Sequence, residues 1–285
     1  MQKAIFPALV VLIFAAPLAV SAQSVKIKGS DTLLPLAQRW TQLYEKKNPQ
    51  VHLLTSGGGS GAGISALLKG DTDIAESSRT ITEAEKEEFR KLGKTPVDVA
   101  VAADAVEILV NSANSISSLT MDQVKGIFSG TITNWKEVGG EDAKIDLYGR
   151  DSSSGTHAFL QEHALHGTRF APGIAEFPAN AAMTAAVLKD KNGVCYAGLN
   201  AGKSLKSLRI STDAKSPALP PTVENIHSTK YPLGRLLHWY LAGRPTGAVK
   251  ELCLWAISPE AQTAAEKMGF ISVPAEIRNS VAARL

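Results

Sequence analysis

Four short segments rich in Gly, Ser and Thr could together bind an anion. They are residues 29–32 (Gly-Ser-Asp-Thr), 56–63 (Ser-Gly-Gly-Gly-Ser-Gly-Ala-Gly), 77–79 (Ser-Ser-Arg) and 150–156 (Arg-Asp-Ser-Ser-Ser-Gly-Thr). We expect each to connect a strand to a helix, and the first N–H groups of a helix lack intrahelical partners and attract negative charge. Hydroxyl groups add neutral donors, and the two Arg side chains add planar groups that match an oxyanion. One such segment alone is typical of an ordinary helix cap, whereas four in one chain predict an oxyanion site.

Two carboxylates lie among these donors. Asp31 is inside the first segment, and Asp104 interrupts an apolar run at residues 102–106. Asp104 has two open interpretations: it caps a turn where two strands meet, or it faces the anion. In the second case a carboxylate can only accept a hydrogen bond, so the ligand must carry its own proton. Phosphate carries one at neutral pH and sulfate does not, so the second interpretation favours phosphate.

Motifs for other chemistries are incomplete. Residues 61–66 resemble a dinucleotide fingerprint but lack the strand-terminal acid about 20 residues later. Residues 198–204 are one residue short of a P-loop, and no Gly-x-Ser-x-Gly supports a hydrolase. His163 and His166 would share a helix face but His157 would not, so a three-His metal site is not expected. We therefore expect no catalysis, no metal and no cofactor.

Composition and charge place the chain among ordinary globular proteins. Its 285 residues suffice for two compact domains, with 44% hydrophobic and 20% charged residues. The formal net charge is only +3 and is evenly spread, which argues against a nucleic-acid or anionic-membrane surface. Any anionic ligand must therefore be bound by a local site. Short apolar runs that alternate with helical periodicity predict an α/β fold.

The N-terminus is typical of an export signal. An early cation precedes an apolar run at residues 4–20, and Val-Ser-Ala at 20–22 supplies the small residues that a signal peptidase recognises. We predict a signal peptide at residues 1–22, cleaved after Ala22, and no membrane span in the mature form. A membrane anchor is the alternative, but the run contains two prolines and is shorter than the roughly 20 residues of a span.

The expected elements form two successive βα series. The first has strands at 25–28, 51–55, 73–75 and 96–102, with helices at 33–44, 59–68 and 82–92. The second has strands at 106–111, 144–148 and near Val194 and Leu208, with helices at 121–128, 155–165 and 181–189. An apolar stretch at 233–240 precedes three terminal helices at 249–257, 259–268 and 274–283. Because no new strand follows them, we expect these helices to pack on the first lobe and to make it discontinuous.

The two cysteines, Cys195 and Cys253, are too few for a disulfide scaffold and lack the spacing of a metal motif. One lies in an expected strand and the other on the apolar face of an expected helix, so both are interpreted as core residues. A disulfide between them stays open as the alternative because export leads to an oxidising compartment.

The chain resembles the periplasmic phosphate-binding proteins of high-affinity phosphate ABC importers. The resemblance runs from Gly29 to about Phe270. The most telling segments are residues 29–35, 57–61, 77–79, 119–140 and 150–156. The tail at 258–270 is shared more widely among type II periplasmic binding proteins, and it supports the fold more than the ligand.

This resemblance implies two α/β lobes that close on the ligand about a hinge. We place lobe 1 at residues 24–102 plus 241–285 and lobe 2 at residues 103–240. The anion would be held by the following groups: Thr32, the Leu33 N–H, Ser60, Arg150, Ser154, the Gly155 N–H and Thr156. Some members have a carboxylate where this chain has Ser78, and the acceptor role is then expected to pass to Asp104, with Arg79 beside it.

The function implied is a periplasmic receptor that captures inorganic phosphate and delivers it to a membrane permease without chemical change. We expect a monomer with no nucleic-acid partner. One alternative is a receptor for another tetrahedral oxyanion, such as sulfate, molybdate or tungstate. Another is a secreted enzyme acting on phosphate esters, which would need a nucleophile with a base or a metal.

Overall fold

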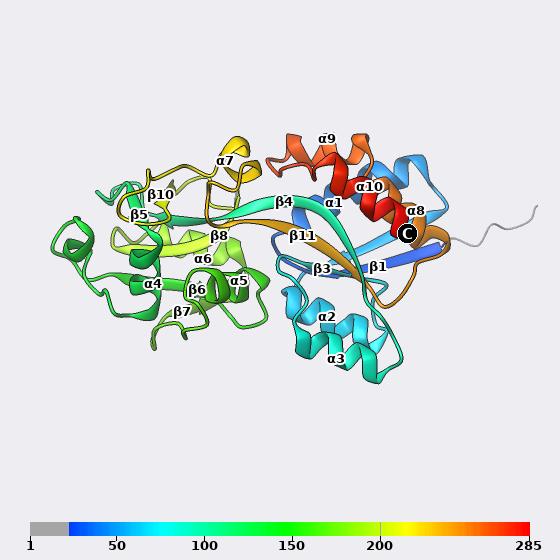
Figure 1. The fold of residues 1–285 in the computed structure, drawn as a ribbon, viewed down its shortest axis with the longest axis horizontal. Helices are drawn as coiled ribbons and strands as arrows, with labels where there is room; N and C mark the ends of the chain where they lie inside the picture. The colour runs from blue at the N-terminus through cyan, green and yellow to red at the C-terminus, as the bar shows by residue number, and fades with distance from the viewer. Residues whose placement is uncertain (1–22, 200) are drawn as a thin grey trace, which may run out of the picture.

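A computed structural model describes residues 23–199 and 201–285, which form two lobes lying side by side (Figure 1). The expected signal peptide at residues 1–22 lies outside the described residues. Two long strands, β4 (Val97–Val110) and β11 (Gly234–Leu241), run from one lobe to the other. Among the described residues, no helix has the length and apolar character needed to cross a membrane.

The first lobe is built on three parallel strands in the order β2 (Val51–Ser56), β1 (Gln23–Gly29) and β3 (Ile74–Ser77). Its helices are α1 (Leu34–Lys47), α2 (Ser60–Lys69), α3 (Glu83–Lys91), α8 (Gly247–Ala256), α9 (Pro259–Lys267) and α10 (Ala275–Arg284). The last three helices contribute Leu252, Ala261 and Val281 to the same core as Trp40 and Trp239. The two Trp rings meet edge to face, with centroids 5.5 Å apart.

The second lobe continues the sheet through β8 (Gly193–Gly198), β6 (Asp146–Arg150) and β7 (Ala175–Phe177). Its helical segments are α4 (Met121–Ser129), η1 (Trp135–Val138), α5 (Gly155–His163), α6 (Asn180–Val187) and α7 (Val223–His227). Two short strands, β5 (Ser118–Thr120) and β10 (Arg209–Ser211), pair separately, and β9 (Lys206–Ser207) pairs with β4. The α/β class predicted from the sequence is therefore confirmed.

Strand β4 corrects one expectation. The sequence predicted two strands that meet near Asp104, but residues 97–110 form a single strand. Strand β11 runs antiparallel to it, and Arg235 lies directly opposite Asp104. The charge that interrupts the apolar run is neutralised by this partner, so the strand continues through it.

Separate hydrophobic cores lie on either side of the crossing strands. Buried residues of the first core come from 25–102 and 237–285, and those of the second come from 103–233 together with Ile271. This division is compatible with the expected lobe boundaries, which remain a prediction.

Both cysteines are buried and free. Cys195 packs beside Leu109 and Met183 in the second lobe, whereas Cys253 belongs to the core of the first lobe. The prediction of two core thiols is confirmed, and the alternative of a disulfide between them is wrong.

Candidate anion-binding site

All four predicted segments meet at the interface between the lobes, and the segment 77–79 does so through Ser78. The Thr32 and Thr156 hydroxyl oxygens lie 3.2 Å apart, although the residues are 124 positions apart in the sequence. The Gly61 N–H donates to the Ser153 carbonyl at 3.0 Å. The segments at residues 29–32 and 56–63 therefore face the segment at 150–156 across the cleft.

The close approach of the loops from the two lobes requires glycine at two positions. A Cβ on Gly155 would lie 2.2 Å from the Ser60 hydroxyl oxygen and 2.7 Å from that of Ser78. A Cβ on Gly59, whose φ is +91°, would lie 2.5 Å from the Ser153 carbonyl oxygen. Only glycine lets the two loops come this near, so the structure brings Ser60, Ser78 and Gly155 together.

The two helices that begin at the site differ at their N-termini, since α5 has a side-chain cap and α1 has none. Ser154 caps α5 and accepts from the His157 N–H at 3.3 Å, while Gly155 and Thr156 open the helix. Helix α1 has no side-chain cap, and the N–H of Leu33 donates to the Ser30 carbonyl at 3.1 Å. The Leu33 N–H is thus engaged in a local turn, whereas the first N–H groups of α5 have no carbonyl partner within their own helix.

Arg150 is buried at the end of β6 and is held by protein oxygens. Its Nε donates to the Phe177 carbonyl at 3.0 Å and its Nη1 to Asn180 Oδ1 at 2.8 Å. Its Nη2 donates to the Pro178 carbonyl at 2.8 Å and to Asp31 Oδ2 at 2.6 Å. Asp31, whose role the sequence left open, is therefore the counter-charge of Arg150 from the opposite lobe.

Asp104 is also paired, but with a residue that the sequence analysis missed. Arg235 Nε donates to Asp104 Oδ1 at 2.7 Å, and Nη2 donates to Oδ2 at 3.1 Å. The same guanidinium reaches the Ser78 carbonyl at 2.9 Å and the Thr156 hydroxyl at 3.2 Å. Burial raises the pKa of Asp104, and the charge of Arg235 opposes that rise.

Arg79 does not lie where the sequence analysis expected it. Its guanidinium forms a two-pronged ion pair with Glu85, at 2.8 and 2.7 Å, in the capped first turn of α3. The expected neighbour of Asp104 is thus replaced by Arg235. The segment 77–79 instead contributes Ser78, whose N–H donates to Ser60 Oγ at 3.1 Å.

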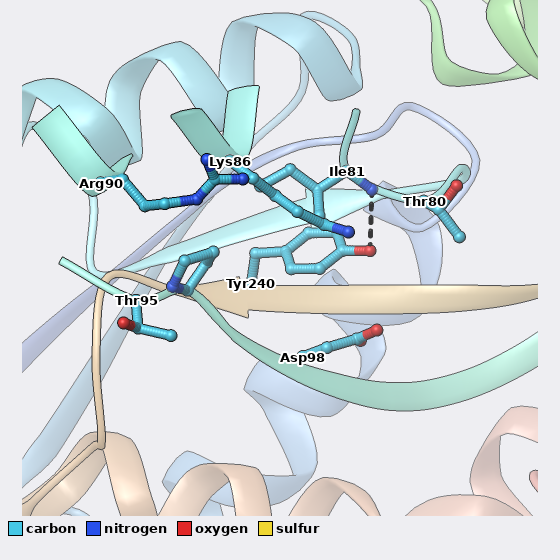
Figure 2. Close-up of a pocket in the computed structure, with 8 residues that line it drawn as sticks. Thr80, Ile81, Lys86, Arg90, Thr95, Asp98 and Tyr240 are labelled. Carbon is cyan, nitrogen blue, oxygen red and sulfur yellow. Dashed lines mark hydrogen bonds between the residues drawn. The ribbon is translucent and has the colours of Figure 1, made fainter. Parts of the chain in front are cut away.

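Two hollows lie near these segments. The one in Figure 2 has a volume of about 380 Å³, and the Tyr240 hydroxyl in it accepts from the Ile81 N–H. Its cations Lys86 and Arg90 both pair with Glu83, and none of the predicted binding residues lines it. The other has a volume of about 450 Å³ and is lined by both lobes, including Asp31, Thr32 and Asn180. The second hollow therefore adjoins the candidate site.

A signal for Arg235 was present in the sequence. It is the only charged residue in the apolar stretch at 233–240, and an isolated charge in a buried strand needs a partner. Asn180 gave no comparable signal, because an Asn at a helix start is common in any protein.

Comparison with known proteins fits this geometry. Residues 16–260 match the family model for a PBP superfamily domain. The chain is 31% identical over 267 residues to the phosphate-binding protein PstS of Pseudomonas aeruginosa, covering 87% of this chain and 83% of that protein. The chain belongs to the family of PstS phosphate-binding proteins. The PstS of Bacillus subtilis is likewise 31% identical, with 88% of this chain and 81% of that protein covered.

Solved structures agree with the PstS assignment. An ABC-type phosphate transport receptor from Vibrio cholerae is 29% identical, with a TM-score of 0.72 over 88% of this chain and all of that one. A Clostridium perfringens protein with bound phosphate, described as a substrate-binding protein of a phosphate ABC transporter, is 25% identical. Its TM-score is 0.80 over 88% of this chain and all of that one. The two-lobed type II fold expected from the PstS-like segments is thereby confirmed.

Proposed function

We propose that this chain is an extracytoplasmic receptor that captures inorganic phosphate between its lobes and delivers it to the permease of an ABC importer. One observation carries the proposal: hydroxyl and N–H donors from both lobes converge where Thr32 faces Thr156. Donors on both sides of a closing cleft can surround an oxyanion, as the removal of its water requires. The PstS family and the relatives with phosphate in their names support the same ligand.

The binding groups we propose come from both lobes. They are the hydroxyls of Thr32, Ser60, Ser78, Ser154 and Thr156, the Gly155 N–H, and the guanidinium of Arg150. We leave out Arg79, because Glu85 holds its guanidinium, and the Leu33 N–H, because the Ser30 carbonyl accepts from it.

Asp104 takes a different role from the one expected. Both of its carboxylate oxygens accept from Arg235, so we propose that it orients this guanidinium toward Thr156. Arg235 then adds a buried cation at the crossing strands, and the carboxylate of Asp104 neutralises its charge. Sulfate, molybdate and tungstate, which are tetrahedral oxyanions too, become the competitors that a binding assay must include.

We propose that the chain performs no catalysis. In the described part of the chain, no group of three His, Cys, Asp or Glu side chains is placed to hold a metal ion. The serines at the site bond to one another and cap a helix: Ser60 Oγ accepts from the Ser78 N–H, and Ser154 Oγ accepts from the backbone N–H of His157. We further propose that residues 1–22 direct export, that cleavage follows Ala22, and that the receptor works as a monomer in the periplasm.

Thermal unfolding of the ligand-stripped chain in different oxyanions tests the proposed ligand. Because a ligand that binds only the folded state stabilises it by RT ln(1 + [L]/Kd), phosphate at about 100 times its Kd adds roughly 2.7 kcal/mol. We expect phosphate to raise Tm by several degrees, and by more than sulfate, molybdate or phenyl phosphate at the same concentration, because phosphate is the ligand named for the relatives. A larger rise in Tm with another anion would show that this anion, and not phosphate, is the preferred ligand. Uptake by vesicles that carry the cognate permease tests delivery.

A further inference from the structure

An ion pair between two protein side chains joins the two lobes. Asp31 lies in the loop before α1 in the first lobe, and Arg150 lies at the end of β6 in the second. Their Oδ2 and Nη2 atoms are 2.6 Å apart, and the side chains are 14% and 2% exposed. Asp31 Oδ1 accepts from the Gly58 N–H at 3.0 Å, which fixes the carboxylate on its own lobe.

Arg150 has little capacity left for another acceptor. Four of its five N–H groups donate to protein oxygens, those of Phe177, Pro178, Asn180 and Asp31. A two-pronged contact with an oxyanion needs two N–H groups, so at least one of these acceptors must leave. Three of them belong to the second lobe and are uncharged, and Asp31 is the one that is anionic and comes from across the cleft.

We propose that Asp31 is an internal competitor of the ligand: its carboxylate occupies Arg150 and holds the lobes closed until an oxyanion displaces it. The ligand part rests on the proposed function, whereas the closure part concerns the protein alone. The carboxylate has the charge and the two-oxygen edge that an oxyanion would present to the guanidinium.

Other contacts make closure without a ligand feasible. The Gly61 N–H to Ser153 carbonyl bond and the contact between Thr32 and Thr156 also cross the cleft. These contacts link uncharged groups, and Asp31–Arg150 adds a nearly buried charge pair to them. The adjoining hollow of about 450 Å³ has Asp31 in its wall, so an arriving anion can reach the pair from that side.

The competition has a definite effect on affinity. A receptor whose ligand-free form is mostly closed on itself binds with an apparent affinity reduced by the fraction that is competent. If the closed form is about ten times more populated than the open form, phosphate affinity is about tenfold lower than without the competitor. Removing the carboxylate should therefore tighten binding, although it removes an ion pair.

The test compares Asp31→Asn with Asp151→Asn. Asp151 follows Arg150 directly, and its Oδ1 accepts from the N–H of Ser153, the residue whose carbonyl bonds to Gly61 across the cleft. Asn keeps this acceptor oxygen, so the control removes a nearby charge and leaves Ser153 held in place. Small-angle scattering is measured on ligand-stripped proteins, and phosphate affinity by calorimetry. Asp31→Ser serves as a second variant if the first does not fold.

We expect the ligand-free wild type and Asp151→Asn to be compact, and Asp31→Asn to have a larger radius of gyration that falls when phosphate is added. We expect Asp31→Asn to bind phosphate at least roughly fivefold more tightly than the wild type. Identical ligand-free scattering of wild type and Asp31→Asn would overturn the closure, and weaker phosphate binding by Asp31→Asn would overturn the competition. If no variant binds phosphate, the proposed function fails while the scattering still decides the closure.

Discussion

Asp104 and Arg235 face each other across the two strands that connect the lobes, and the guanidinium binds both carboxylate oxygens. The Asp104 side chain is fully buried, and that of Arg235 is 3% exposed. A buried pair of this kind is costly to break from one side, because the remaining charge has no partner. The pair therefore fixes the crossing point and also positions a cation beside Thr156.

Arg235→Met should destabilise the protein strongly. The substitution leaves the Asp104 carboxylate buried without its cation, so we expect the free energy of unfolding to fall by about 3–5 kcal/mol. Urea unfolding measures this, with Arg209→Met as the matched control because Arg209 is exposed. The double variant Asp104→Leu/Arg235→Met should be more stable than Arg235→Met alone. A double variant whose loss of unfolding free energy equals the sum of the losses of the two single variants would contradict the pairing.

Arg150→Ala should lower phosphate affinity by at least a hundredfold. Hydrogen bonds to charged groups are worth roughly 1.5–3 kcal/mol each, and the substitution removes the charge together with its donors. Arg150→Lys keeps the charge and loses the fork, so its affinity should lie between those of Arg150→Ala and the wild type. Calorimetry with phosphate measures the series, and equal affinities for all three proteins would remove Arg150 from the site.

Arg79→Ala should change phosphate affinity by less than about twofold. Its guanidinium is held by Glu85 at the start of α3 and not by Asp104, so the effect should be on stability, at about 1 kcal/mol for a partly exposed pair. Binding and urea unfolding measured on the same variant separate the two effects. A large loss of affinity with unchanged stability would place Arg79 at the ligand after all.

Glu76 should make stability depend on pH. Its carboxyl group is fully buried on β3, its Oε1 accepts from Trp239 Nε1 at 2.9 Å, and its Oε2 has no hydrogen-bond partner. Burial raises its pKa to about 8, with a smaller contribution from the charge of Asp31. The folded state thus holds a proton that the unfolded chain releases near pH 4.5.

The proton on Glu76 sets the direction of the pH dependence. The stabilisation that it gives the folded state is complete below about pH 4.5. It is lost as the pH rises toward 8, and the free energy of unfolding falls by up to about 1.4 kcal/mol per pH unit. Glu76→Gln, which has no proton to lose, should remove this slope and be more stable than the wild type at pH 8. Chemical unfolding at pH 5 to 9 measures it, and parallel profiles for the two proteins would show that Glu76 does not titrate in this range.

Much of the site was predictable because helix starts leave a local signature. The segments around Thr32, Ser60 and Ser154 are strand-to-helix loops in which Gly, Ser and Thr have few other roles. Since such loops lie at the carboxyl ends of strands, their convergence follows from the α/β fold.

The pairing of charges was not predictable in the same way. Arg79 is close to Ser78 in the sequence, yet its partner is set by the turn that brings Glu85 back to it. The partner of Asp104 is 131 positions away, and only the register between β4 and β11 selects it. Asp31 and Arg150 contact each other only because the two lobes come together, and no local pattern in the sequence indicates how close the lobes lie.

Calorimetric titration of the ligand-stripped chain with phosphate measures whether the cleft between the lobes binds this anion. We predict one phosphate per chain, bound with a micromolar or lower Kd, which corresponds to about 8 kcal/mol, and weaker binding of sulfate at the same concentrations. Absence of heat from phosphate, or equal binding of sulfate, would contradict this prediction.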